Sequence, residues 1–189
     1  ISILNVDMLA NSEFYTAAFP PQYGNALSGV FDISFRKGNT NQHEFSAGFG
    51  MLGLEATAEG PMGKNSNNSF LVNYRYSSLD LIDKLGIADF GGVPKYQDAA
   101  FNLNFRTKNG GQLSFFGMGG LSSIQEKGYE DETEKVLQYE GKYSTNTGVI
   151  GATYLKTLSA KSYLESTISA SGNSITDQTS IQNNDSIVV

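Results

Sequence analysis

The sequence contains no cysteine and no tryptophan, and its one histidine is His43. The absence of cysteine excludes a disulfide framework and a thiolate metal site. One histidine excludes a multi-histidine zinc centre, and no Gly-x-Ser-x-Gly nucleophile motif accompanies it. We therefore expect no enzyme, no metal and no cofactor. The net charge is −6, which argues against a nucleic-acid partner because such proteins need clustered lysine and arginine.

Long apolar runs and a leader sequence are also lacking. No stretch of about 18 apolar residues predicts a transmembrane helix, and no signal-peptide pattern precedes the rest of the chain. Glycine, phenylalanine and tyrosine are abundant, with 21, 12 and 10 residues among 189, while charged residues amount to only 17%. This composition favours β structure. Both ends of the sequence look cut from a longer protein.

Alternating polar and apolar residues predict seven strands after a break at residues 38–41. Their ranges are 42–50, 54–60, 69–77, 99–107, 112–123, 145–158 and 162–176. Residues 51–53, 64–68, 109–111 and 159–161 form the short connections. Two connections are long: one includes a possible short helix at 78–86, and the other is acidic and spans 126–141. Short turns at one sheet end and long loops at the other are typical of outer-membrane barrels.

The predicted strands have one polar and one apolar face. Five charged residues share the polar face: Glu44, Glu55, Glu59, Arg75 and Arg106. A half-buried sheet of a soluble protein alternates as well, but here the polar face holds mostly Asn, Ser, Thr and Gly, as a wet lumen would. Tyr74 and Tyr76 would suit the aromatic girdle of a membrane barrel. Because single-chain bacterial barrels have even strand numbers, seven strands imply a remainder outside this chain.

Residues 14–33, which include Phe19-Pro20-Pro21-Gln22-Tyr23-Gly24, resemble the end of the plug domain of TonB-dependent outer-membrane transporters of the Bacteroidetes type. In that family a similar motif closes the plug before the first barrel strand. The motif positions are Tyr23, Gly24, Asn25, Ala26, Gly29, Val30 and Asp32. Residues 59–63, ending in Gly60-Pro61-Met62-Gly63, resemble the turn after the family's second strand.

The resemblance implies an all-β fold: a partial transmembrane antiparallel β-barrel of about seven strands (residues 41–189), preceded by the C-terminal part of a plug domain (residues 1–40). The family's barrels have about 22 strands and a plugged lumen. They import scarce, bulky nutrients such as siderophores, cobalamin or glycans. The implied partners are outer-membrane lipid, an unidentified ligand, and a TonB-type energy-coupling protein that binds a plug segment outside this chain.

Lumen-facing candidates follow from this interpretation. Glu55, Glu59, Arg75 and Arg106 are expected to face the plug, and we predict that some of them pair with Arg36 or Lys37. Substituting Arg75 is then expected to loosen the plug. The acidic run at 130–134 could bind calcium, but it lacks the EF-hand spacing, so a solvated loop is favoured.

Two other functions stay open. One is a passive outer-membrane barrel, either a porin or an adhesin, without a plug. The other is a soluble carbohydrate-binding β domain. The plug-like segment distinguishes the transporter from the first, and a requirement for detergent distinguishes both membrane functions from the second.

Overall fold

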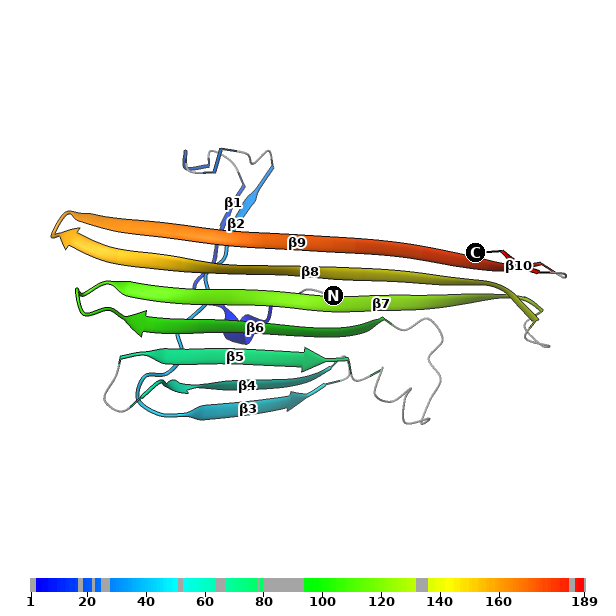
Figure 1. The fold of residues 1–189 in the computed structure, drawn as a ribbon, viewed down its shortest axis with the longest axis horizontal. Coiled ribbons are helices and arrows are strands. Elements are labelled where there is room, and N and C mark those ends of the chain that lie inside the picture. The colour runs from blue at the N-terminus through cyan, green and yellow to red at the C-terminus, as the bar shows by residue number, and fades with distance from the viewer. Residues whose placement is uncertain are drawn as a thin grey trace.

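The structure is a computed structural model that describes residues 3–16, 19–21, 23–24, 28–50, 53–63, 67–77, 79, 94–131, 136–183 and 186–188. Figure 1 shows a long sheet crossed by the N-terminal part of the chain. The predicted helix at 78–86 lies outside the described residues apart from Leu79, so it stays a prediction.

The described chain is all-β, as predicted, and its main element is an antiparallel sheet in which each strand pairs with the next. Neither edge strand, β3 or β10, is paired with a further strand in the described part, so the sheet is not closed. The strands are β3 (Glu44–Phe49), β4 (Leu54–Pro61), β5 (Ser69–Tyr76), β6 (Lys95–Arg106), β7 (Gln112–Asp131), β8 (Val136–Ser159), β9 (Ser162–Asn183) and β10 (Ser186–Val188).

The N-terminal part forms only short elements. They are a 3₁₀ turn η1 (Val6–Met8) and two strands, β1 (Glu13–Tyr15) and β2 (Val30–Asp32), which pair in a separate two-stranded sheet. An isolated bridge joins Leu9 to Phe35. The described residues show no plug domain, and the domain boundary near residue 40 stays a prediction.

One connection was predicted wrongly. Residues 126–141 are almost entirely strand, because β7 continues to Asp131 and β8 begins at Val136. Register pairs such as Glu126 with Gly141 carry the β7–β8 ladder through this polar stretch. Backbone hydrogen bonds satisfy a strand whatever its side chains are. A polar composition therefore indicated a loop where strand pairing makes an extended sheet.

The strand boundaries also differ from the prediction. β6 begins at Lys95 rather than near residue 99, β9 continues to Asn183, and β10 was not expected. The turn predicted at 109–111 is confirmed: Thr107 and Gly111 are joined by a backbone hydrogen bond, and Gly110 has a φ of 75°. Glycine is favoured there because other residues rarely adopt this conformation.

The register confirms that the five predicted charges share one face. Glu44 pairs with Glu59, and Glu55 pairs with Arg75, which in turn pairs with Asp98. Directly opposed residues of an antiparallel pair point to the same side of the sheet. We call this side the polar face, and the opposite side, which carries Phe45, Val72, Phe101, Leu113 and Ile150, the apolar face.

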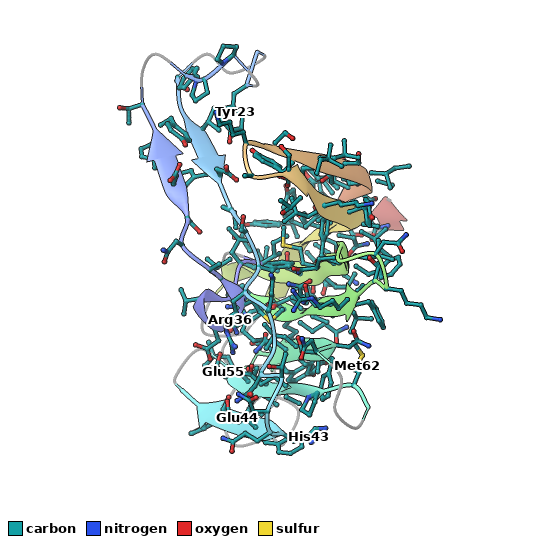
Figure 2. The ribbon with its side chains drawn as sticks, turned by 90° about the vertical axis from the view of Figure 1, so that its left-hand side faces the viewer. Tyr23, Arg36, His43, Glu44, Glu55 and Met62 are labelled. Carbon is teal, nitrogen blue, oxygen red and sulfur yellow. The ribbon has the colours of Figure 1, made fainter. Side chains whose placement is uncertain are left out.

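The small core lies on the polar face. Met8 and Leu71 are fully buried, Ala100 is nearly so, and Phe35 and Met118 pack against them. In Figure 2 the β1–β2 hairpin, with Tyr23 near it, lies to one side of the sheet, and the chain then passes Arg36 on its way to β3. The core therefore forms where residues 3–39, called the N-terminal segment below, cross the sheet.

Candidate functional site

The candidate site is the seam between the N-terminal segment and the polar face of β4–β7. At its centre, Arg36 forms a bidentate ion pair with Glu59 of β4. Arg36 Nη1 donates to Glu59 Oε2 at 2.8 Å, and Nη2 donates to Oε1 at 2.7 Å. The backbone N–H of Asn39 also donates to Glu59 Oε2, at 2.8 Å. A buried carboxylate with three donors and a matching guanidinium fork makes a directional clamp.

The arginine of this clamp is held from both sides. Its Nε donates to the carbonyl oxygen of Asp7 at 2.5 Å, and its own carbonyl accepts from Asn102 Nδ2 of β6 at 2.9 Å. The hydrogen bonds to Glu59 raise the pKa of Arg36 above its ordinary value. Arg36 therefore stays charged, and the clamp ties η1, the N-terminal segment and two sheet strands together.

Apolar contacts reinforce the same seam. Met8 inserts its side chain against Leu71 and Ala100, and Phe35 packs beside it with its ring 6.5 Å from that of Phe116. The chain also approaches the sheet backbone closely, since a Cβ on Gly38 would lie 2.0 Å from the carbonyl oxygen of Phe70. Only glycine fits there.

Further polar contacts extend the seam along the sheet. Asn5, which is buried, donates from Nδ2 to Glu55 Oε2 at 3.3 Å. Lys37 donates from Nζ to Gln112 Oε1 of β7 at 2.7 Å. A Cβ on Gly120 of β7 would lie 2.8 Å from Ile3 Cγ2. The N-terminal segment is therefore anchored on four successive strands.

The remaining predicted lumen residues behave differently. Arg75 forms its ion pair with Asp98 within the sheet, with Nε 2.8 Å from Oδ1. Arg106 lies exposed at the end of β6, and its backbone N–H donates to Asn68 Oδ1. Glu44, Glu55 and Glu59 all accept hydrogen bonds from the N-terminal segment, and Glu44 Oε1 accepts from Asn39 Nδ2 at 2.9 Å.

The predicted motif residues lie mainly in the β1–β2 hairpin. Val30 pairs with Tyr15 in the ladder, and the Tyr23 hydroxyl donates to Asp32 Oδ2 at 2.6 Å. A Cβ on Gly29 would lie 3.1 Å from the Phe14 ring, and Gly24 lies close to Pro21. Asn25 and Ala26 lie outside the described residues.

Three aromatic residues of this hairpin have further partners. The Phe14 and Phe31 rings stack at 4.2 Å. A hydrogen bond to Glu13 raises the pKa of Tyr15 to about 12. The motif therefore organises a hairpin beside the sheet, and the contacts with the sheet come from the residues that precede and follow it.

Several buried polar atoms on the polar face have no hydrogen-bond partner among the described residues. They include Asn73 Oδ1, Asn102 Oδ1, Asn104 Nδ2 and Ser69 Oγ. Buried polar groups are normally satisfied by protein or ordered water. A wet seam would meet this need, whereas a dry hydrophobic core would not.

The described residues contain no cluster of candidate metal ligands. No group of three or more His, Asp or Glu in the described part could hold a metal ion. His43 lies against Phe70, with ring centroids 5.8 Å apart. The acidic run at 130–134 lies partly outside the described residues, so its proposed calcium role stays a prediction.

Sequence reasoning missed three important residues of the seam. Met8 lies against the polar face, and Asn102 and Asp98 lie on it. The alternation of the predicted strand 99–107 placed Asn102 on this face but did not indicate its hydrogen bond to the Arg36 carbonyl. Asp98 could have been found by extending the strand predicted at 99–107 by one residue, since it falls on the polar face together with Asn102. Met8 had no such signal, because it lies in an irregular segment.

No family model, curated protein or solved structure matches the chain. No helix in the described part is both long and apolar enough to cross a membrane.

Proposed function

We propose that this chain belongs to a TonB-dependent outer-membrane transporter, and that it comprises the end of the plug and the first strands of the barrel. The observation that carries the proposal is the contrast between the two sheet faces. The N-terminal segment is clamped onto the polar face through Arg36 and Glu59. The apolar face is open, with Phe45, Ile150 and Ile168 exposed at 77%, 60% and 78%.

The apolar face has the dimensions of a membrane-crossing surface. Its uncharged positions run from Phe105 to Gln97 along β6, from Leu113 to Gln125 along β7 and from Tyr154 to Ser144 along β8. These spans of 9, 13 and 11 residues are close to the about 9–11 residues with which a tilted strand crosses a bilayer. The nearest charges on that face are Lys156 on one side, and Lys95 and Lys142 on the other. An exposed apolar patch of this extent needs a partner, and lipid is the partner that suits alternating strands.

The open edges of the sheet support further strands in the complete protein, because an exposed edge with unpaired backbone groups does not occur in lipid. The plug-like segment favours the energised transporter over a passive pore, because its clamp lies on the face that would become the lumen. The transported molecule would be a scarce, bulky nutrient.

Two arginine substitutions test whether the apolar face meets lipid. Ile168→Arg places a charge on the apolar face of β9, close to the centre of the uncharged band. Ser169→Arg places the same charge one residue further along, on the polar face. Both side chains are exposed on the sheet. If both faces meet water, either substitution should change the free energy of unfolding by less than about 0.5 kcal/mol. In a bilayer Ile168→Arg costs about 2–4 kcal/mol, while Ser169→Arg is tolerated.

The measurement is urea unfolding of the intact protein from phosphatidylcholine vesicles, together with recovery of each variant in the outer-membrane fraction. Equal stability and equal recovery of the two variants would refute the membrane proposal. Energised uptake is tested by growth on limiting iron, cobalamin or glycan. Deleting the gene and deleting the TonB-type coupling protein should then give the same defect. A defect that arises only on gene deletion would indicate a passive pore.

A further inference from the structure

A hollow of about 520 Å³ lies on the sheet at the end of the uncharged band of β6, β7 and β8, where Lys95 and Lys142 border it. Most of its lining side chains belong to the apolar-face positions: Tyr76, Lys95, Gln97, Ser123, Lys142 and Ser144. The register places them together, since Lys95 pairs with Ser123 and Ser123 pairs with Ser144. Lys142 is the next outward position along β8. The two lysines therefore flank a pair of serines.

The hollow marks a boundary on this face. Towards the β6–β7 turn the outward positions are Leu121, Gly119, Gly117, Phe115 and Leu113. In the other direction β7 and β8 continue as a polar ladder past Gln125 and Lys142, towards the right-hand end of Figure 1. Tyr76 pairs with Gln97 at this level, and the hydroxyl of Tyr74, which lies opposite Ala99, donates to Gln97 Oε1 at 2.9 Å. Tyrosines at such a level are typical of membrane–water interfaces.

The charges that border the uncharged band on this face are all lysines, although the chain carries a net charge of −6. Among the described apolar-face positions of β3–β9, no acidic residue lies between the level of Lys156 and the level of Lys142. The first acidic residue beyond them is Glu140. Two ammonium groups beside serine hydroxyls and the Asn146 amide suit a phosphate, which accepts hydrogen bonds and carries negative charge.

We propose that this hollow binds the phosphate of an anionic lipid headgroup, with the acyl chains lying down the apolar face beside Leu121. This inference rests on the proposed membrane function, which places the hollow at headgroup depth. The connections at this end include the long one between β5 and β6, and in outer-membrane barrels the longer loops are extracellular. The lipid bound here is therefore one of the outer leaflet.

The test compares two lipids with identical acyl chains, phosphatidylglycerol and phosphatidylcholine, added to the intact protein in dodecyl maltoside micelles. Native mass spectrometry counts the retained lipid. We expect selective retention of phosphatidylglycerol. The double variant Lys95→Gln/Lys142→Gln should weaken that retention roughly tenfold to thirtyfold. This factor is the combined effect of removing two lysines, each of which strengthens binding to anionic lipid by a similar amount. The charge-preserving control Lys95→Arg/Lys142→Arg should retain it.

Equal retention of the two lipids, or an unchanged glutamine variant, would overturn the inference. Competition by inorganic phosphate at the concentration of the lipid would show a site for free anions and would overturn the lipid assignment. The result is separable from the proposed function. If Ile168→Arg blocks insertion while the lysine variants keep normal lipid retention, the membrane function stands and this inference fails.

Discussion

Replacing Arg36 by alanine should release the N-terminal segment from the sheet. Removing one partner from a fully buried ion pair costs about 3–5 kcal/mol, because the other charge is left without compensation. A fully exposed pair is worth at most about 1 kcal/mol. The Arg36 side chain is 34% exposed and that of Glu59 is 10% exposed. The expected cost therefore lies between these limits, at about 2 kcal/mol.

Trypsin gives a direct assay for this release, because the segment contains a cleavage site after Lys37. Gly38 follows it and packs against the backbone of β5, so cleavage requires the segment to lift. When opening and closing are fast, cleavage tracks the population of the open state. A loss of about 2 kcal/mol should therefore raise the rate of cleavage after Lys37 roughly thirtyfold.

Cleavage after Lys161, in the exposed β8–β9 turn, is the internal reference and should not change. Glu59→Gln is the matched variant from the other side of the clamp. It keeps an acceptor for Asn39 but loses the charge, and its effect should be smaller. The double variant Arg36→Ala/Glu59→Gln should recover part of the loss, because no charge is then left buried and unpaired. An unchanged rate after Lys37 in Arg36→Ala would refute the reasoning.

Two further substitutions test the apolar and steric parts of the seam. Met8→Ala removes a fully buried side chain and should lower the stability of the seam by about 2–3 kcal/mol. The loss is measured as faster hydrogen exchange of the Arg36 amide, which donates to the Met8 carbonyl. Met8→Leu should cost less than about 1.5 kcal/mol, and equal exchange in both variants would contradict the packing. Gly38→Ala should displace the N-terminal segment and speed cleavage after Lys37, because its Cβ would meet the Phe70 carbonyl. The control Gly172→Ala should leave cleavage unchanged, because a Cβ there has no atom within 4 Å. Similar rates in the two variants would show that the close approach at Gly38 is not maintained.

The alternation in the sequence was enough to predict an all-β chain, the antiparallel order of the strands and the shared face of Glu44, Glu55, Glu59, Arg75 and Arg106. These features follow from a period of two, because each step along a strand reverses the side-chain direction. Turn chemistry at Gly110 placed one hairpin correctly. Both signals are local, so a single sequence carries them.

The length of each strand could not be predicted from its local sequence. The stretch at 126–141 is polar and acidic, and its composition indicated a connection. The ladders between β7, β8 and β9 carry it as strand, since the pairing partner decides whether backbone groups are satisfied. The sequence alone does not show which residues a strand will find opposite it.

The partners of the charges were decided by tertiary structure. Charge alternation placed Arg75 on the polar face, and the position of Asp98 directly opposite in β6 turned it into a bond within the sheet. Arg36 reaches Glu59 because η1 and Met8 set the height of the N-terminal segment above the sheet. The sequence by itself determined which residues face the same side. Only the folded chain determined which of them meet, because that depends on the path of an irregular segment, for which sequence provides no period.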